Sequence, residues 1–206
     1  GFSLAYTAFS FSKAAQDTAQ KAYESASSDP GQGGRFVPLL GDQATRMPEW
    51  LKDWYKDKAM TGVINHEARN HMPEDLHRYL FASCHAAVNK GASPRSADYP
   101  EELAPAHKNW KSGNFADRFK VQAENRVAST VTSHISKDGH YFIHYDPSQC
   151  RSLTVREAAR IQTFPDNYFF EGNRTQQYVQ VGNAVPPLLA KYVAEAVYEI
   201  IQGSRR

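Results

Sequence analysis

The spacing of apolar residues changes twice along this 206-residue chain, and this change limits the folds open to it. Apolar residues recur at helical spacing up to about Val88. Between Phe119 and His144 the β-branched and aromatic residues follow a period of two, and after Cys150 the helical spacing returns. Helical and strand periods in separate stretches predict an α+β fold with a short β-sheet. The length and the 41% hydrophobic content are sufficient for a real core.

Three helices are predicted in the first half. Alanine spacing predicts one over 12–27, and a second over 47–58 places Trp50 and Trp54 on one face as core anchors. A third begins at Pro73, with Asn89-Lys90-Gly91 as its end. Its expected buried stripe consists of Leu76, Leu80, Cys84 and Ala87.

Strands are predicted over 119–122, 126–133 and 140–144, with a hairpin turn at Lys137-Asp138-Gly139. The polar surface of this sheet would hold Thr130, Thr132 and Ser133, with Lys137 at the tip. The earlier glycines Gly31, Gly33 and Gly34 do not open a helix after a strand, so they predict a flexible loop and no nucleotide-binding turn.

Two helix signals follow Cys150. Thr154 and Glu157 have capping-box spacing, and Pro165 ends the helix that they begin. A last helix opens at Pro186-Pro187 and ends at Gly203. Its apolar stripe is formed by Leu189, Val193, Ala196, Val197 and Ile200.

Charge and composition exclude several classes of protein. The net charge of +2 is too small to predict a nucleic-acid partner by itself, although the second half of the chain is mildly basic. No apolar run approaches the roughly 20 residues that cross a bilayer, and no signal peptide is evident. A cytoplasmic location without membrane contact is therefore expected. The two cysteines, Cys84 and Cys150, lie too far apart in sequence for a C-x-x-C site and are expected to be reduced.

Histidine spacing does not predict a metal site. His66 and His71 are five residues apart, whereas one helix face needs four, and His140 and His144 would lie on a strand. We expect structural histidines and no metal. A histidine-dependent nuclease built on His66 and His71 is the remote alternative.

Two long stretches near the end carry a family resemblance. The first, RSLTVREAARIQTFPD over 151–166, resembles the ninth motif of the cytosine-5 DNA methyltransferases. The second, QVGNAVPPLLA over 180–190, is similar to the tenth motif. The shorter STVT at 129–132 resembles the Thr-Leu element of the target-recognition region, with Val131 at the leucine position.

The resemblance implies a division into a target-recognition region over 1–147 and a motif IX and X segment over 148–206. The closing helices of the family return to a Rossmann-like cofactor domain. The family reaction needs a Pro-Cys-Gln nucleophile, a Glu-Asn-Val acid and an early cofactor loop, and none of these motifs occurs here. We therefore expect this chain to be a carboxy-terminal fragment that contains no catalytic residue. It should be inactive without its N-terminal catalytic domain.

Residue roles follow from the same resemblance. Asn183, Ala184 and Val185 would line the site of S-adenosylmethionine, with Gly182 in a tight bend. Candidates for contact with double-stranded DNA are Thr130, Val131, Ser133, Lys137 and Arg151. Arg156 and Arg160 are expected to be structural, with an Arg156–Glu157 ion pair. For Arg151, a phosphate contact and a structural role are equally favoured.

A different class of function is also open. The two motifs could be retained as scaffold in a non-catalytic module that binds DNA or a partner protein. The stripe of the closing helix would then need burial against its own recognition domain or in a homodimer.

Overall fold

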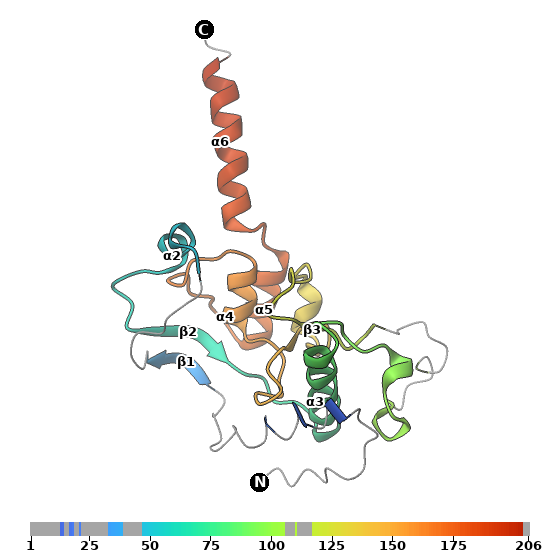
Figure 1. The fold of residues 1–206 in the computed structure, drawn as a ribbon. Coiled ribbons are helices and arrows are strands. Elements are labelled where there is room, and N and C mark those ends of the chain that lie inside the picture. Colours follow the sequence, from blue (N-terminus) through green and yellow to red (C-terminus); the bar gives the residue numbers. More distant parts are fainter. Residues whose placement is uncertain are drawn as a thin grey trace. The chain divides into compact units, whose positions relative to one another are not determined.

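A computed structural model describes residues 13–14, 17–18, 21, 33–38, 47–105, 110 and 117–203 (Figure 1). The predicted helix over 12–27 lies largely outside these residues. The chain forms two compact units. One consists mainly of Arg69–Ser129 and Gly139–Leu153, and the other of Gln32–Ala68, Thr130–Asp138 and Thr154–Arg206. They are called the α3 unit and the α5 unit below, after a helix that each contains.

The α5 unit contains an antiparallel strand pair that the sequence analysis missed. Strand β1 (Gly33–Pro38) pairs with β2 (Gly62–Glu67), with Gly33 opposite Glu67 and Pro38 opposite Gly62. The prediction of a flexible loop at Gly33 and Gly34 is therefore wrong. Gly62 explains part of the pairing, because a Cβ there would overlap the Phe36 ring and the Val37 carbonyl oxygen.

Helix α2 (Glu49–Tyr55) confirms the helix predicted over 47–58, but only one of its two tryptophans is an anchor. Trp54 donates from Nε1 to the Thr163 carbonyl at 2.8 Å, and the Tyr55 hydroxyl donates to the Arg160 carbonyl at 2.6 Å. Trp50 is 59% exposed. The expectation that Trp50 is a core residue is therefore wrong, and the next aromatic, Tyr55, is buried instead.

The α5 unit also contains helices. Helix α4 (Val155–Ile161) begins at the predicted cap, since the Glu157 N–H donates to the Thr154 hydroxyl and the Thr154 N–H to the Glu157 carboxylate. Helix α5 (Arg174–Asn183) was not predicted, and it has its own capping box of Asn173 and Gln176. A short 3-10 helix, η3 (Ser133–Ser136), packs against α5.

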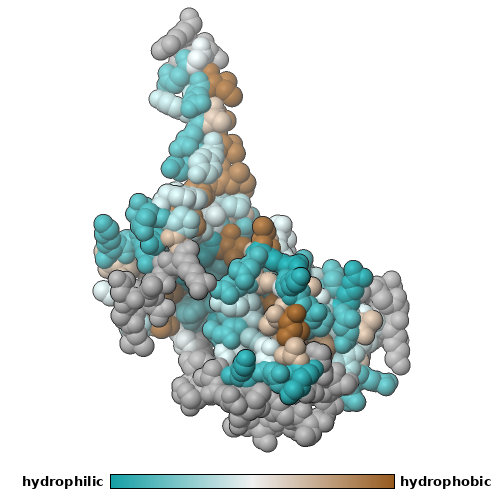
Figure 2. Space-filling view, in the orientation of Figure 1, coloured by the Kyte–Doolittle hydropathy of each residue, from teal (hydrophilic) through white to brown (hydrophobic). Residues whose placement is uncertain are grey.

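Helix α6 (Pro187–Gly203) closes the chain as predicted, and none of its residues is buried. Figure 2 shows brown, hydrophobic side chains along this helix. The exposed large hydrophobic residues of α6 include Leu189, Val193, Val197 and Ile200, whose exposed fractions lie between 49% and 68%. Packing of this stripe on the recognition region, or in a homodimer, stays a prediction. No described helix has the length and apolar character needed to cross a membrane.

The α3 unit is built around helix α3 (Pro73–Val88), which has the predicted start and end. Strands β3 (Val121–Gln122) and β4 (Ile143–His144) pair in parallel near it. Two 3-10 helices, η1 (Ser96–Asp98) and η2 (Glu101–Leu103), lie between α3 and β3 in sequence. The core consists of Tyr79, Phe81, Ala82, Ala86, Tyr99, Leu103, Phe119, Val121 and Ile143.

Two expectations for this unit are wrong. The stretch 126–133 forms no strand and β3 and β4 are parallel, so the hairpin with a turn at Lys137-Asp138-Gly139 does not exist. Along α3, Cys84 is buried as expected, but Ala87 is exposed and Tyr79 and Ala82 lie in the core. The mixture of helices with two small sheets agrees with the predicted α+β class. The regions 1–147 and 148–206 were defined by function and stay a prediction.

Candidate functional site

The segment 130–138 presents a polar surface without being a strand. Val131 and Ile135 are four residues apart and both are buried, which holds the segment to the α5 unit. Thr130, Thr132, Ser133 and Lys137 are exposed. Three of the DNA-contact candidates in this segment, Thr130, Ser133 and Lys137, are thus accessible to a ligand. Val131, at 3% exposure, faces the interior and can only support the segment.

A buried amide connects this segment to the end of α5. Gln162, which follows α4, is 7% exposed, and its Nε2 lies 3.3 Å from the Val131 carbonyl oxygen. The same nitrogen lies 3.2 Å from the carbonyl oxygen of Val181 and 3.4 Å from that of Ala184. All three neighbours are acceptors, so the NH₂ and not the oxygen of the amide must point here. Sequence reasoning missed Gln162, and its place inside the ninth motif was the only signal.

Gly182 gives a second contact between the same two segments. A Cβ at this position would overlap the backbone of Thr132 and Ser133. Gly182 is helical and has no positive φ, so the expected tight bend at Gly182 is wrong. A glycine is needed here because the α5 backbone approaches the 132–133 backbone with no side chain between them.

The three cofactor candidates lie together where α5 ends. Asn183 is the last residue of α5, Ala184 is its C-cap, and Val185 is followed by Pro186 and then by Pro187, the first residue of α6. Val185 is 65% exposed and Asn183 is exposed as well. Contact of these three residues with a cofactor stays a prediction.

Arg156 carries a buried positive charge that is bound by backbone oxygens. It is 1% exposed, and it donates to the carbonyls of Ile64 at 3.0 Å, Pro165 at 3.0 Å and Tyr168. Burial lowers the pKa of its guanidinium to about 10, because the charged form loses hydration. The predicted structural role agrees with this geometry, but the expected Arg156–Glu157 ion pair is replaced by these carbonyls.

Arg160 forms a two-bond ion pair with Asp166, with Nε and Nη2 each 2.7 Å from a carboxylate oxygen. The hydrogen bond to Asp166 raises the pKa of this guanidinium. Arg156 and Arg160 thus hold the loop that follows α4, which carries Thr163 and Pro165. Thr163 in turn accepts the Leu188 N–H at the start of α6 through its hydroxyl, at 3.0 Å.

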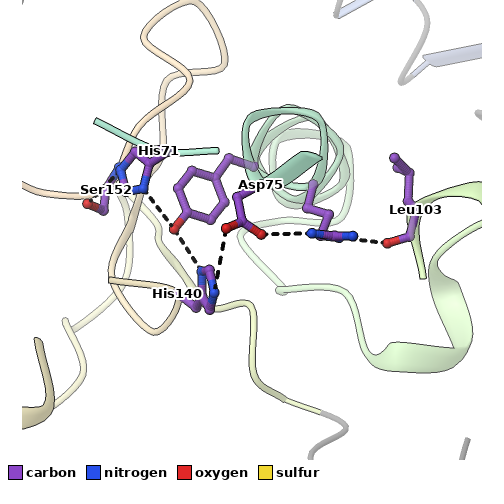
Figure 3. A network of polar contacts seen from close by, with 7 residues as sticks. His71, Asp75, Leu103, His140 and Ser152 are labelled. Carbon is purple, nitrogen blue, oxygen red and sulfur yellow. Dashed lines mark hydrogen bonds and ion pairs between the residues drawn. The ribbon is translucent and has the colours of Figure 1, made fainter. Parts of the chain in front are cut away.

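The α3 unit contains a chain of polar contacts that accounts for two of the histidines (Figure 3). The Ser152 N–H points to Nε2 of His71 at 3.3 Å, so this nitrogen is an acceptor and the His71 proton lies on Nδ1. Nδ1 faces the Tyr79 hydroxyl at 3.4 Å, and that hydroxyl lies 2.8 Å from Nδ1 of His140. His140 Nε2 lies 4.0 Å from Asp75, which pairs with Arg78 at 2.8 Å. The network fixes 139–152 on α3.

Arg151 lies beside this network and is held locally. Its Nε donates to the Gln149 side chain at 2.9 Å, and its Nη1 donates to the Ser152 carbonyl at 3.1 Å. The side chain is half-buried. These contacts favour a structural role, and the contact of Arg151 with DNA stays a prediction.

The remaining candidates for chemistry do not form a reactive site. His66 Nδ1 contacts the Thr154 hydroxyl at 2.9 Å, and among the described residues no group of three His, Cys, Asp or Glu side chains could hold a metal. Burial raises the pKa of Cys84 and of Cys150 to about 12. Both are therefore protonated thiols at neutral pH, whereas a cysteine nucleophile must be a thiolate.

Comparison with known proteins agrees with the motifs. Residues 8–199 match the family model for C-5 cytosine-specific DNA methylase. The type II methyltransferase M.Bpa9945I of Bacillus paralicheniformis is 54% identical over 142 residues, which are 69% of this chain and 31% of that protein. M1.HphI of Haemophilus parahaemolyticus is 38% identical over 67% of this chain and 32% of its own length.

The DNA (cytosine-5-)-methyltransferase M.ApeKI of Aeropyrum pernix is 48% identical over 65 residues, which are 32% of this chain and 14% of that protein. The chain therefore spans about a third or less of the length of these relatives. Because the family model covers nearly the whole chain, and because both long motifs occur in it, the chain belongs to the C-5 cytosine-specific DNA methylase family.

Proposed function

We propose that this chain is the carboxy-terminal part of an enzyme that methylates carbon 5 of cytosine in double-stranded DNA. In this proposal it supplies target recognition and one wall of the cofactor site. The nucleophile and the catalytic acid come from sequence outside these 206 residues. Support comes from the family membership, from the share of about a third of the relatives' length, and from the raised pKa values of both cysteines.

The DNA-contacting surface in this proposal is the exposed side of 130–138. Short hydroxyl side chains at Thr130 and Ser133 suit hydrogen bonds to base edges, and Lys137 suits a phosphate. Buried Val131 and Ile135 hold the segment in place. Arg151 would add a phosphate contact through guanidinium N–H groups that its bonds to Gln149 and Ser152 do not use.

S-adenosylmethionine, when bound, supplies the methyl group of the reaction. Asn183, Ala184 and Val185 would contact it from the end of α5, at the position that Gln162 holds through the Ala184 carbonyl. Helix α6 would pack its apolar stripe on the Rossmann-like cofactor domain of the complete protein. The observation that carries this step is that Leu189, Val193, Val197 and Ile200 are exposed together on a helix with no buried residue.

Methyl transfer from labelled S-adenosylmethionine to duplex DNA tests the proposal. The complete protein should transfer label, and this chain alone should bind DNA weakly, in a salt-dependent way, and transfer none. Transfer by the chain alone would contradict the assignment of catalysis to other sequence. A complete protein that lacks a Pro-Cys-Gln motif and is inactive would favour a non-catalytic module.

A further inference from the structure

We propose that Gln162 couples DNA binding to cofactor binding by tying the 130–133 backbone to the end of α5. This inference rests on the proposed function of these two segments. Gln162 touches neither ligand in this view and acts as a positioning residue. It deepens the proposed function because it makes the two binding events depend on each other.

The geometry of the Gln162 amide provides the physical link. Two N–H groups serve three carbonyl oxygens, those of Val131, Val181 and Ala184, at 3.2–3.4 Å. A carbonyl oxygen that moves away from this amide loses its buried donor, and this cost favours a joint movement of the three carbonyls. One of them lies in the predicted DNA-contact segment, and another belongs to the C-cap residue among the cofactor candidates.

Gly182 provides an independent second link. The backbone of α5 meets that of Thr132 and Ser133 so closely that a methyl group has no space between them. Backbone atoms cannot change rotamer to absorb a displacement, as side chains can. A shift of 132–133 on binding DNA therefore displaces α5 next to Asn183.

Coupling of this kind has a thermodynamic signature. If DNA tightens cofactor binding by some factor, the cofactor tightens DNA binding by the same factor. We expect wild-type coupling of at least about fivefold, the lower end of the usual range for coupled sites. Neither binding event by itself requires the Gln162 amide.

The test measures binding of S-adenosylhomocysteine, which cannot react, by the complete protein with and without a duplex that the wild type methylates. Gln162→Leu should bring the coupling factor to within about twofold of one. Gln177→Leu is the matched control. Gln177 is 9% exposed and lies in α5, but its amide donates to the carbonyl of Gly172, just before the start of that helix, at 3.0 Å. The Gln177→Leu variant should retain the coupling between DNA binding and cofactor binding.

Retained coupling in Gln162→Leu, or equal loss in Gln177→Leu, would overturn the inference. A wild-type protein that binds both ligands without coupling would overturn it too and leave the proposed function intact. A wild type that binds neither ligand would instead contradict the proposed function and the inference with it.

Hydrogen exchange on the wild-type protein provides a readout that needs no variant. S-adenosylhomocysteine should slow exchange of amides in 131–136, and DNA should slow exchange in 181–185. Protection confined to the segment that each ligand contacts would contradict the coupling.

Discussion

The structural role of Arg156 could be predicted from the sequence, but its hydrogen-bond partners could not. A basic residue inside a capped helix indicated structure, and the nearest acid, Glu157, was the obvious partner. The actual partners are carbonyls of Ile64, Pro165 and Tyr168, the first of them 92 residues away in sequence. Local sequence specifies the cap of α4, but not which distant backbone oxygens lack donors.

Replacing Arg156 tests this role. Arg156→Met removes donors from three carbonyls, and we expect a loss of about 3–5 kcal/mol in the free energy of unfolding, because buried acceptors without donors cost about 1–3 kcal/mol each. Arg160→Met should cost about 1 kcal/mol, since its ion pair with Asp166 is partly exposed. Urea denaturation of the two variants measures the difference. Equal losses would contradict the account.

The two thiols allow a second test at this scale. With pKa values of about 12, Cys84 and Cys150 have a thiolate fraction of roughly one in ten thousand at pH 8. Iodoacetamide should modify neither in the native chain and both in denaturant, as mass spectrometry would show. Rapid native alkylation of either residue would indicate a reactive cysteine that the burial does not predict.

The elements differ in how far the sequence predicts them. Helices α3, α4 and α6 have strong local signals, a leading proline or a capping box with periodic apolar residues. Helix α5 was missed because its interior is polar, although Asn173 and Gln176 have capping-box spacing. The segment 126–133 has strand-like residues, but the packing of Val131 and Ile135 on a helix about 45 residues later decides its conformation.

Gly182 provides the test at the level of elements. Gly182→Ala should raise intrinsic helix propensity by nearly 1 kcal/mol and still destabilise the chain by about 1–3 kcal/mol, because the methyl group overlaps the 132–133 backbone. Gly203→Ala is the control. Its Cβ would meet nothing within 4 Å, and we expect no loss. Thermal unfolding measures both, and a stabilised Gly182→Ala variant would contradict the close approach.

At the scale of the whole molecule, the α+β class followed from the apolar periods, whereas the strand pairing did not. β1 and β2 are joined by more than 20 residues, and β3 and β4 by a similar number, so neither pair carries a turn signal. The sequence predicted that the apolar stripe of α6 must pack against another surface. It does not specify which surface that is.

Introducing two charged residues into the apolar stripe of α6 tests which surface it packs against. Val193→Asp with Val197→Asp should change the unfolding free energy of this chain by less than about 0.5 kcal/mol, because both side chains are exposed. In the complete protein we expect a loss of methyl transfer and of several kcal/mol in stability, since each valine would lose roughly 1.5 kcal/mol or more of burial. Glu195→Gln, on the opposite side of the helix, should be neutral in both.

Light scattering distinguishes packing of α6 against a second copy of the chain from packing against the rest of the complete protein. If α6 pairs with itself in the isolated chain, the wild type should be a homodimer and the double variant a monomer. A monomeric wild type would restrict the partner to the rest of the protein.

The two units alternate along the sequence, and this order limits which segments can be exchanged between relatives. A cassette of 69–129 would transplant α3 and β3 while leaving behind β4 and His140, the partners of β3 and Tyr79. A segment of 69–153 keeps those pairs, but it also brings 130–138 into the α5 unit of another protein. There the backbone of 132–133 must fit against Gly182, and the Val131 carbonyl must accept from Gln162. Recombination breakpoints that preserve function should therefore fall near 68 and 153, and the imported 130–138 must already suit the resident helix.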